Sequence, residues 1–177
     1  MKNISRYMLI VLLLCIVMST VLSGCKKQTQ TVSPITGGVT DRTDKSAPKE
    51  IASKDIEEFF LYFYLENHDD SDYEDGFYSF SIKKNDKDGF VLTSNELGLN
   101  TPVGQDVLIK LQDIIDKSSL VKKNGIYRVT AGLPPEYQPC TLTVTYSSGE
   151  KLTFTEDNDP WAGWTQEMFT VLVSNAG

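Results

Sequence analysis

The sequence predicts an α+β domain over residues 51–177, in which an antiparallel sheet of about five strands carries two amphipathic helices on one face. Short segments rich in aromatic and β-branched residues are separated by Asp- and Gly-rich turns, which is typical of strands. Two later segments alternate polar and apolar residues around a short turn, which indicates a β-hairpin. Two further segments repeat apolar residues at helical spacing.

Three strands are predicted in the first half of this domain, and they are residues 59–66, 77–84 and 89–94. The first two are rich in aromatic residues, and the third follows a tight turn. An alternative for the first segment is a helical start at Asp55, because Glu57 and Glu58 are residues that favour the first turn of a helix.

The hairpin is predicted to join residues 141–146 to residues 151–155 through the turn at Ser147-Ser148-Gly149-Glu150. Because side chains on a strand alternate between its two faces, the apolar members should share one face and the threonines should point away. The apolar members are Leu142, Val144, Tyr146, Leu152 and Phe154.

Each of the two predicted helices follows a polar residue and a proline, a pattern typical of an N-cap and the first helical position. These pairs are Thr101-Pro102 and Asp159-Pro160. The apolar stripe of the first helix consists of Val107, Leu108, Leu111, Ile114 and Ile115. The stripe of the second consists of Trp161, Trp164, Met168 and Leu172.

Residues 1–24 are predicted to be a secretory signal peptide, because a basic start precedes an apolar run and small residues. The run is shorter than the roughly 20 residues that a permanent membrane-spanning helix needs. It ends at Leu22-Ser23-Gly24-Cys25, which resembles the lipobox of bacterial lipoproteins. The resemblance implies that the Cys25 thiol carries diacylglycerol and that the chain is cut before this cysteine. The alternatives are an ordinary signal peptide and an uncleaved signal anchor.

Residues 25–50 are predicted to be the lipidated cysteine followed by a flexible tether. The segment after Cys25 has no aromatic residue and few large aliphatic ones, so it offers little apolar surface to bury. Cys15 lies in the predicted signal peptide and Cys25 would carry the lipid. Cys140 is then the cysteine that remains in the domain, and no disulfide is expected within the chain.

The net charge of −7 argues against a nucleic-acid partner, since such proteins need basic patches to neutralise phosphates. Residues 51–177 hold 10 Lys and Arg against 21 Asp and Glu, a net charge of −11. Residues 26–50 hold five basic residues against three acidic ones. The sequence therefore predicts an acidic domain on a slightly basic tether, facing a neutral or cationic partner.

The candidates for chemistry each have a plainer interpretation. His68 fits a base or a ligand, but it stands in an acidic stretch that is typical of a solvated turn. The acidic loops hold weak calcium-site candidates, although neither loop matches the EF-hand pattern. These candidates are Asp70, Asp72, Asp86 and Asp88. Cys140 is expected to be a small buried hydrophobe rather than a nucleophile. No cofactor is predicted.

Aromatic side chains are the remaining candidates. Trp161 and Trp164 suit the stacking of a sugar, although their helical register favours a place in the core. Tyrosines on strands must alternate between faces, so some are exposed, and an exposed patch of them would be a binding surface.

These observations together predict a lipid-anchored lipoprotein on the extracytoplasmic side of the cell membrane. Its domain is expected to be a binding or interaction module of the cell envelope, with a protein or a glycan as its ligand. One alternative is a carboxylate-based envelope hydrolase, and another is an accessory or inhibitory subunit of another envelope protein. A flat aromatic patch would favour binding, whereas a cleft of carboxylates with raised pKa would favour the enzyme.

Overall fold

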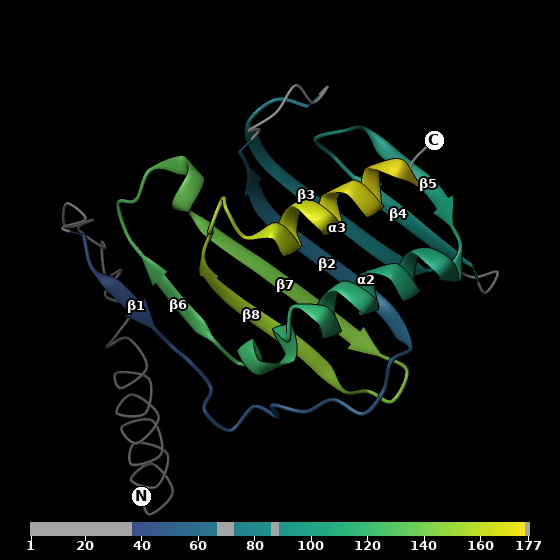
Figure 1. The fold of residues 1–177 in the computed structure, drawn as a ribbon, viewed down its shortest axis with the longest axis horizontal. Coiled ribbons are helices and arrows are strands. Elements are labelled where there is room, and N and C mark those ends of the chain that lie inside the picture. Colours follow the sequence, from purple (N-terminus) through teal and green to yellow (C-terminus); the bar gives the residue numbers. More distant parts are fainter. Residues whose placement is uncertain (1–36, 67–72, 86–88, 176–177) are drawn as a thin grey trace, which may run out of the picture. The chain divides into compact units, whose positions relative to one another are not determined.

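The computed structural model describes residues 37–66, 73–85 and 89–175 (Figure 1). All of these belong to one of the two compact units of the chain, residues 35–177. The predicted signal peptide, Cys25 and His68 lie outside the described residues, as do Asp70, Asp72, Asp86 and Asp88. The helices that are described are too short or too polar to cross a membrane.

The described strands form one mixed sheet of eight, in the order β1-β6-β8-β7-β2-β3-β4-β5. The strands are β1 (Val39–Asp41), β2 (Ile56–Leu65), β3 (Gly76–Lys84), β4 (Phe90–Ser94), β5 (Leu99–Val103), β6 (Tyr127–Thr130), β7 (Pro139–Tyr146) and β8 (Lys151–Asp157). Neighbours in this sheet pair antiparallel except β6 and β8, which are parallel.

The predicted α+β class is confirmed, but the antiparallel sheet of about five strands is wrong in detail. The five predicted strands correspond to β2, β3, β4, β7 and β8, and the β7–β8 hairpin is present as expected. The three others are β1, β5 and β6, of three, five and four residues. β1 and β6 hold too few alternations to stand out in a sequence, and β5 contains the Thr101-Pro102 pair that predicted a helix start. The alternative helical start at Asp55 is wrong, because β2 is extended from Ile56 onward.

Two α-helices, α2 (Gln105–Lys117) and α3 (Gly163–Ser174), lie on the same face of the sheet (Figure 1). Short 3-10 helices, η1 (Leu120–Lys123) and η2 (Pro135–Tyr137), stand in the connections. The predicted start of the first helix at Thr101 is wrong, since Thr101 and Pro102 belong to β5 and Gly104 is the N-cap. Proline is tolerated in β5 because this strand lies at the edge of the sheet.

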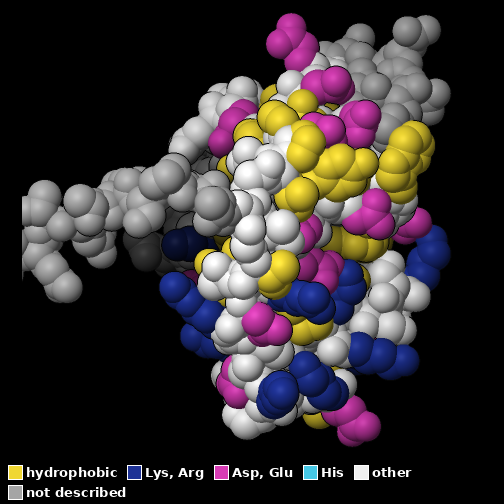
Figure 2. Space-filling model, turned by 90° about the vertical axis from the view of Figure 1, so that its left-hand side faces the viewer, with side chains coloured by type: hydrophobic (Ala, Val, Ile, Leu, Met, Phe, Trp, Pro, Cys, Tyr) yellow, Lys and Arg dark blue, Asp and Glu magenta, His cyan; other side chains and the backbone are white. Residues whose placement is uncertain are grey.

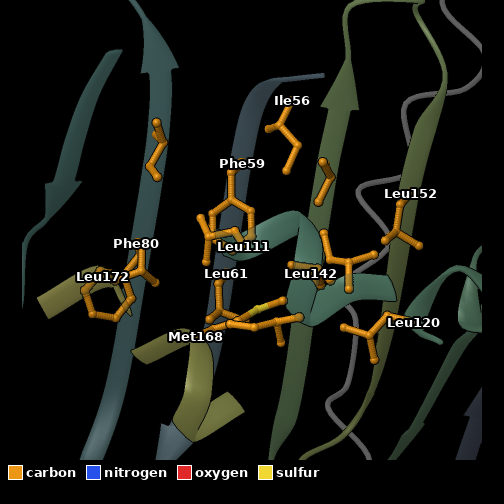
Figure 3. Packing of buried hydrophobic residues seen from close by; sticks show 14 of the residues in the cluster. Ile56, Phe59, Leu61, Phe80, Leu111, Leu120, Leu142, Leu152, Met168 and Leu172 are labelled. Atoms are coloured by element: carbon orange, nitrogen blue, oxygen red, sulfur yellow. The ribbon is translucent and has the colours of Figure 1, made fainter. Parts of the chain in front are cut away.

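The core lies between the helices and the sheet (Figure 3). Phe59, Leu61 and Phe63 alternate along β2 and are all buried on this side. Leu111 of α2 and Met168 of α3 belong to the same cluster and pack on these residues from the helices. The predicted stripe of α2 and the apolar face of the hairpin are confirmed, because every member of both is buried. Each such side chain contributes about 1.5–3 kcal/mol relative to an exposed one.

The stripe predicted for α3 is confirmed only in part. Met168 and Leu172 are fully buried, and Trp164 packs edge-on against the Phe154 ring with centroids 5.9 Å apart. Trp161 precedes the helix and is 70% exposed, so its assignment to the core is wrong. The Asp159 carboxylate accepts a hydrogen bond from the Trp161 N–H at 3.0 Å, and this turn delays the helix until Gly163.

The described part of the predicted tether, residues 37–50, packs on the domain, so the tether boundary predicted at residue 50 is wrong. β1 pairs with β6 in this segment. The Asp44 N–H donates to the Gly125 carbonyl at 2.8 Å. Gly125 has φ +81°, and a Cβ there would lie 2.5 Å from the Asp44 carbonyl oxygen, so this contact requires glycine. Backbone pairing needs no large apolar side chains, which is why composition did not reveal the contact.

Asn124 fastens this segment to the sheet. Its buried side chain donates to the Pro48 carbonyl at 2.9 Å and to the Lys151 carbonyl at 3.0 Å. Its Oδ1 accepts from the Thr153 N–H at 2.8 Å. The Asn124 backbone carbonyl also accepts a hydrogen bond from the Lys49 ammonium. One amide thus joins residues that precede β2 to the outer side of β8.

Replacing this amide should therefore destabilise the domain. Asn124→Ala leaves the Thr153 N–H and two carbonyls without their partner, and we expect the free energy of unfolding to fall by about 2–4 kcal/mol. Urea denaturation followed by circular dichroism measures the change. The matched control is Asn100→Ala, at an exposed position of β5, which should change stability by less than about 0.5 kcal/mol. Equal losses in the two variants would contradict the role given to Asn124.

Candidate binding surface on the uncovered sheet face

The sheet face opposite the helices carries a row of aromatic side chains. Phe60, Tyr62 and Tyr64 alternate with the buried residues of β2, so they point away from the core. Phe60 is 38% exposed, and the two tyrosines are half-buried. Phe77 of β3 pairs with Tyr64 across the strands and joins them on this face. We call these four residues the aromatic row.

Ring contacts hold most of the aromatic row in place. The Tyr62 and Phe77 rings are parallel within 4°, with centroids 5.5 Å apart. Tyr64 meets the same Phe77 ring edge-on at 5.1 Å. Such pairs contribute about 0.5–1.5 kcal/mol beyond the burial of area, so the rings are ordered before any ligand arrives. An ordered aromatic patch binds with less loss of side-chain entropy than a mobile one.

Beside the aromatic row the same face is rich in hydroxyl groups. Thr141 and Thr155 pair through their hydroxyls at 2.9 Å across β7 and β8, and Thr143 and Thr153 pair at 3.1 Å. A shallow hollow of about 410 Å³ adjoins Thr143 and Phe60 on this face. Its lining residues are Glu58, Phe59, Phe60, Ser81, Lys83, Thr143 and Thr145. This part of the face offers polar contacts next to apolar rings.

A fixed carboxylate stands beside the aromatic row. Glu96 follows β4 and accepts hydrogen bonds from the Ser79 N–H at 3.1 Å, the Ser79 hydroxyl at 2.8 Å and the Ser94 hydroxyl at 3.2 Å. Burial alone would raise the pKa of Glu96, but the backbone, Ser79 and Ser94 hydrogen bonds together outweigh it and lower this pKa. Glu96 is therefore a charged group at neutral pH, and its position is set by β3 and β4.

The charge of Glu96 acts on the aromatic row. Burial raises the pKa of Tyr62, and the negative charge of Glu96 raises it further. The pKa of Tyr64 is also raised, first by burial and then by the charges of Asp75, Glu136 and Glu66. The tyrosines therefore stay neutral and can donate hydrogen bonds at neutral pH, in a negative local potential.

The candidates His68, Asp70, Asp72, Asp86 and Asp88 lie outside the described residues, so a catalytic or metal site can be assessed only in the described part of the chain. No group of three or more His, Cys, Asp or Glu side chains there is placed to hold a metal ion. Where a carboxyl pKa shifts, it shifts downward, which is the reverse of what a general acid near neutral pH requires. The shifted carboxyls are Asp41, Asp44, Glu96 and Glu150.

Sequence reasoning identified strand tyrosines as candidates but did not name the aromatic row or Glu96. The signal for the row is the run from Phe59 to Tyr64, in which aromatic or large apolar residues occupy both faces of one strand. A strand with one buried face normally alternates apolar and polar residues, so aromatic residues on both faces indicate a second contact surface. Nothing local to Glu96 indicates its serine partner 17 residues earlier.

Comparisons with known proteins do not assign the chain to a family. No family model, curated protein or solved structure matches the chain.

Cys140 should be chemically silent in the folded protein. It is almost fully buried on β7, and burial raises its pKa to about 12, so at about pH 8 nearly all of it is the unreactive thiol. We expect no alkylation of the peptide that contains Cys140 by iodoacetamide in native protein, and complete alkylation in guanidinium chloride. Mass spectrometry of tryptic peptides separates this cysteine from the two others. Rapid native alkylation would show that the site opens to solvent.

Proposed function

We propose that the protein is a lipid-anchored binding module on the extracytoplasmic side of the cell membrane, and that the uncovered face of its sheet contacts the ligand. The lipobox resemblance at Cys25 supports the anchor and the location. The main support for a binding function is the exposed aromatic row. The ligand is a protein or a glycan of the cell envelope.

The aromatic row supports binding because contact between apolar rings and water is unfavourable, and a ligand would remove that contact. Aromatic side chains dominate the energetics of binding surfaces, where they lose little conformational freedom on contact. In this chain Phe60, Tyr62 and Tyr64 share one strand face that neither α-helix covers, so apolar area remains in contact with water. A ligand that excludes this water gains free energy without any rearrangement of the sheet.

The carboxylate-based hydrolase is less well supported. Its requirement is a pair of carboxyl groups with separated pKa values, one raised to act as the acid. Glu96, the carboxylate most tightly fixed beside the aromatic row, has a lowered pKa and is bound by two serines. An accessory or inhibitory subunit would use the same surface as a binding module.

The anchor is tested by Cys25→Ala. This variant lacks the thiol that would receive diacylglycerol, so metabolic labelling with an alkyne fatty acid should be lost and the protein should leave the membrane fraction. Cys140→Ala is the matched control, and it should keep both the label and the membrane association. Undiminished labelling of Cys25→Ala would contradict the anchor.

The binding surface is tested by photo-crosslinking in intact cells. With p-benzoyl-phenylalanine in place of Tyr62, we expect a defined adduct after illumination, because the benzophenone lies at the proposed contact. With the same group in place of Ile109, which is 55% exposed on α2, no such adduct should form. Adducts of equal yield at both positions, or none at Tyr62, would contradict a ligand on the sheet face.

A further inference from the structure

We infer that the aromatic row binds an arginine- and lysine-rich peptide segment, whose cationic side chains lie over the Tyr62 and Tyr64 rings and face the carboxylates around them. This inference rests on the proposed function, since it names the class of ligand for the same surface. Four arguments support it.

The first argument is the local charge. The end of the aromatic row at Tyr64 lies where β2 ends and β3 begins (Figure 1). Carboxylates of Glu66, Asp75 and Glu136 act electrostatically on Tyr64, and Glu96 acts on Tyr62 from the side of β4. Among the described residues, the charges that act on these two rings are negative, whereas Lys83 lines the hollow beside Phe60 at the other end of the row. Aromatic faces bounded by negative charge are the surroundings that attract a cation.

The second argument is the distribution of charge over the domain. On the side of the molecule that carries β1, Lys and Arg gather in the lower half, while hydrophobic side chains stand among Asp and Glu in the upper half (Figure 2). The end of β2 lies toward the upper part in Figure 1, which shares its vertical axis with Figure 2. On this side of the domain, the basic side chains are therefore concentrated away from the end at which β2 finishes.

The third argument is that this chain already uses the same chemistry. The Arg42 guanidinium lies over the Tyr127 ring, 5.7 Å from its centroid, where β1 meets β6. Guanidinium groups stack on tyrosine faces because the charge is attracted to the ring and the planar group is weakly hydrated. Tyr62 and Tyr64 offer the same side chain beside carboxylates, without an arginine of the described chain above them in any observed contact.

The fourth argument is shape, which selects a peptide over a small cation. Alternate residues on a strand lie about 6.6–6.8 Å apart, so the rings from Phe60 to Tyr64 extend over roughly 13 Å. Alternate side chains of an extended peptide have the same spacing. A small quaternary ammonium ion instead needs rings on several sides, and this row is a single open surface. A second copy of the chain is a less suitable ligand, because residues 51–177 of each copy carry a net charge of −11. The two copies would therefore repel each other.

The experiment uses the full lipidated chain in nonionic detergent micelles and measures fluorescence anisotropy. The probe is a labelled Arg-Thr repeat of about eight residues, long enough to span the row. A Gln-Thr repeat of the same length is the uncharged control. We expect the Arg-Thr probe to bind at least about tenfold more tightly than the Gln-Thr probe, and its affinity to fall severalfold as salt is raised above about 0.1 M.

Variants locate the site. Tyr62→Leu and Tyr64→Leu keep an apolar side chain and remove the ring, so each should weaken binding of the Arg-Thr probe about three- to tenfold. Glu136→Gln should weaken it about two- to fivefold without disturbing the hydrogen bonds that hold Glu96. The matched controls are Asp113→Asn, an exposed carboxylate on α2, and Trp161→Leu, an exposed aromatic residue before α3. Both should bind like the unaltered protein.

The results that would overturn the inference are distinct from those that would overturn the proposed function. Equal binding of the two probes, or losses in Asp113→Asn as large as those in Glu136→Gln, would show that the row does not select cations. Binding of chitohexaose that Tyr62→Leu abolishes would identify a glycan ligand instead, and a dimer in sedimentation that Tyr62→Leu dissolves would identify a second copy. In these cases the adduct at Tyr62 in cells still supports a binding module. If the adduct is absent as well, both proposals fail.

Discussion

The two faces of β2 are the constraint on which the rest of the structure depends. This strand lies inside the sheet, between β3 and β7, and large side chains occupy both of its faces. Phe59, Leu61 and Phe63 must be buried together, and the opposite set, with two phenolic hydroxyls, must stay near water. A register slip of one residue would exchange the two sets and bury hydroxyls without partners. Pairing of Leu61 with Phe80 and with Leu142 therefore fixes the core and the exposed aromatic surface in one step.

The helices of the described residues cover one face of the sheet. Both α2 and α3 pack on the side of Leu61, and they also contact each other. Neither α-helix covers the opposite face. There, threonine hydroxyls on β7 and β8 form hydrogen bonds with one another. This division explains how one small domain has both a dry interior and an aromatic surface.

The parts of the fold that could be predicted from the sequence are those whose pattern repeats often enough to exceed chance. The helical spacing of apolar residues in α2 and the polar–apolar alternation around Gly149 each extend over several positions. Both the helix and the hairpin are present. β1 and β6 are short, and they pair residues 39–41 with residues 128–130, which are far apart in the sequence. The strand at Thr101 was mistaken for a helix start because a polar residue before proline is compatible with both.

The candidate surface was predictable in kind but not in detail. Alternation alone requires some tyrosines to be exposed, but it does not say which of the two faces the helices cover. The position of the Glu96 carboxylate depends on hydrogen bonds from Ser79. Ser79 lies on β3 and Glu96 follows β4, so only the folded sheet brings the two residues together. Trp161 was predicted to be buried but is exposed. The turn that Asp159 makes places it before the helix, outside the helical register that the sequence suggests.

The position of β2 also determines when the chain can fold. Its partner β7 pairs residues 56–62 with residues 141–146, so the centre of the sheet joins the first third of the chain to its last third. Contacts of such long range are slow to form, because the intervening chain must first be closed into a loop. Until β7 is available, the edge of β2 that faces it has no partner strand, and an unpaired edge favours aggregation. A ribosome or a translocation channel that delays the last 40 or so residues would therefore prolong the most vulnerable stage in the life of this protein.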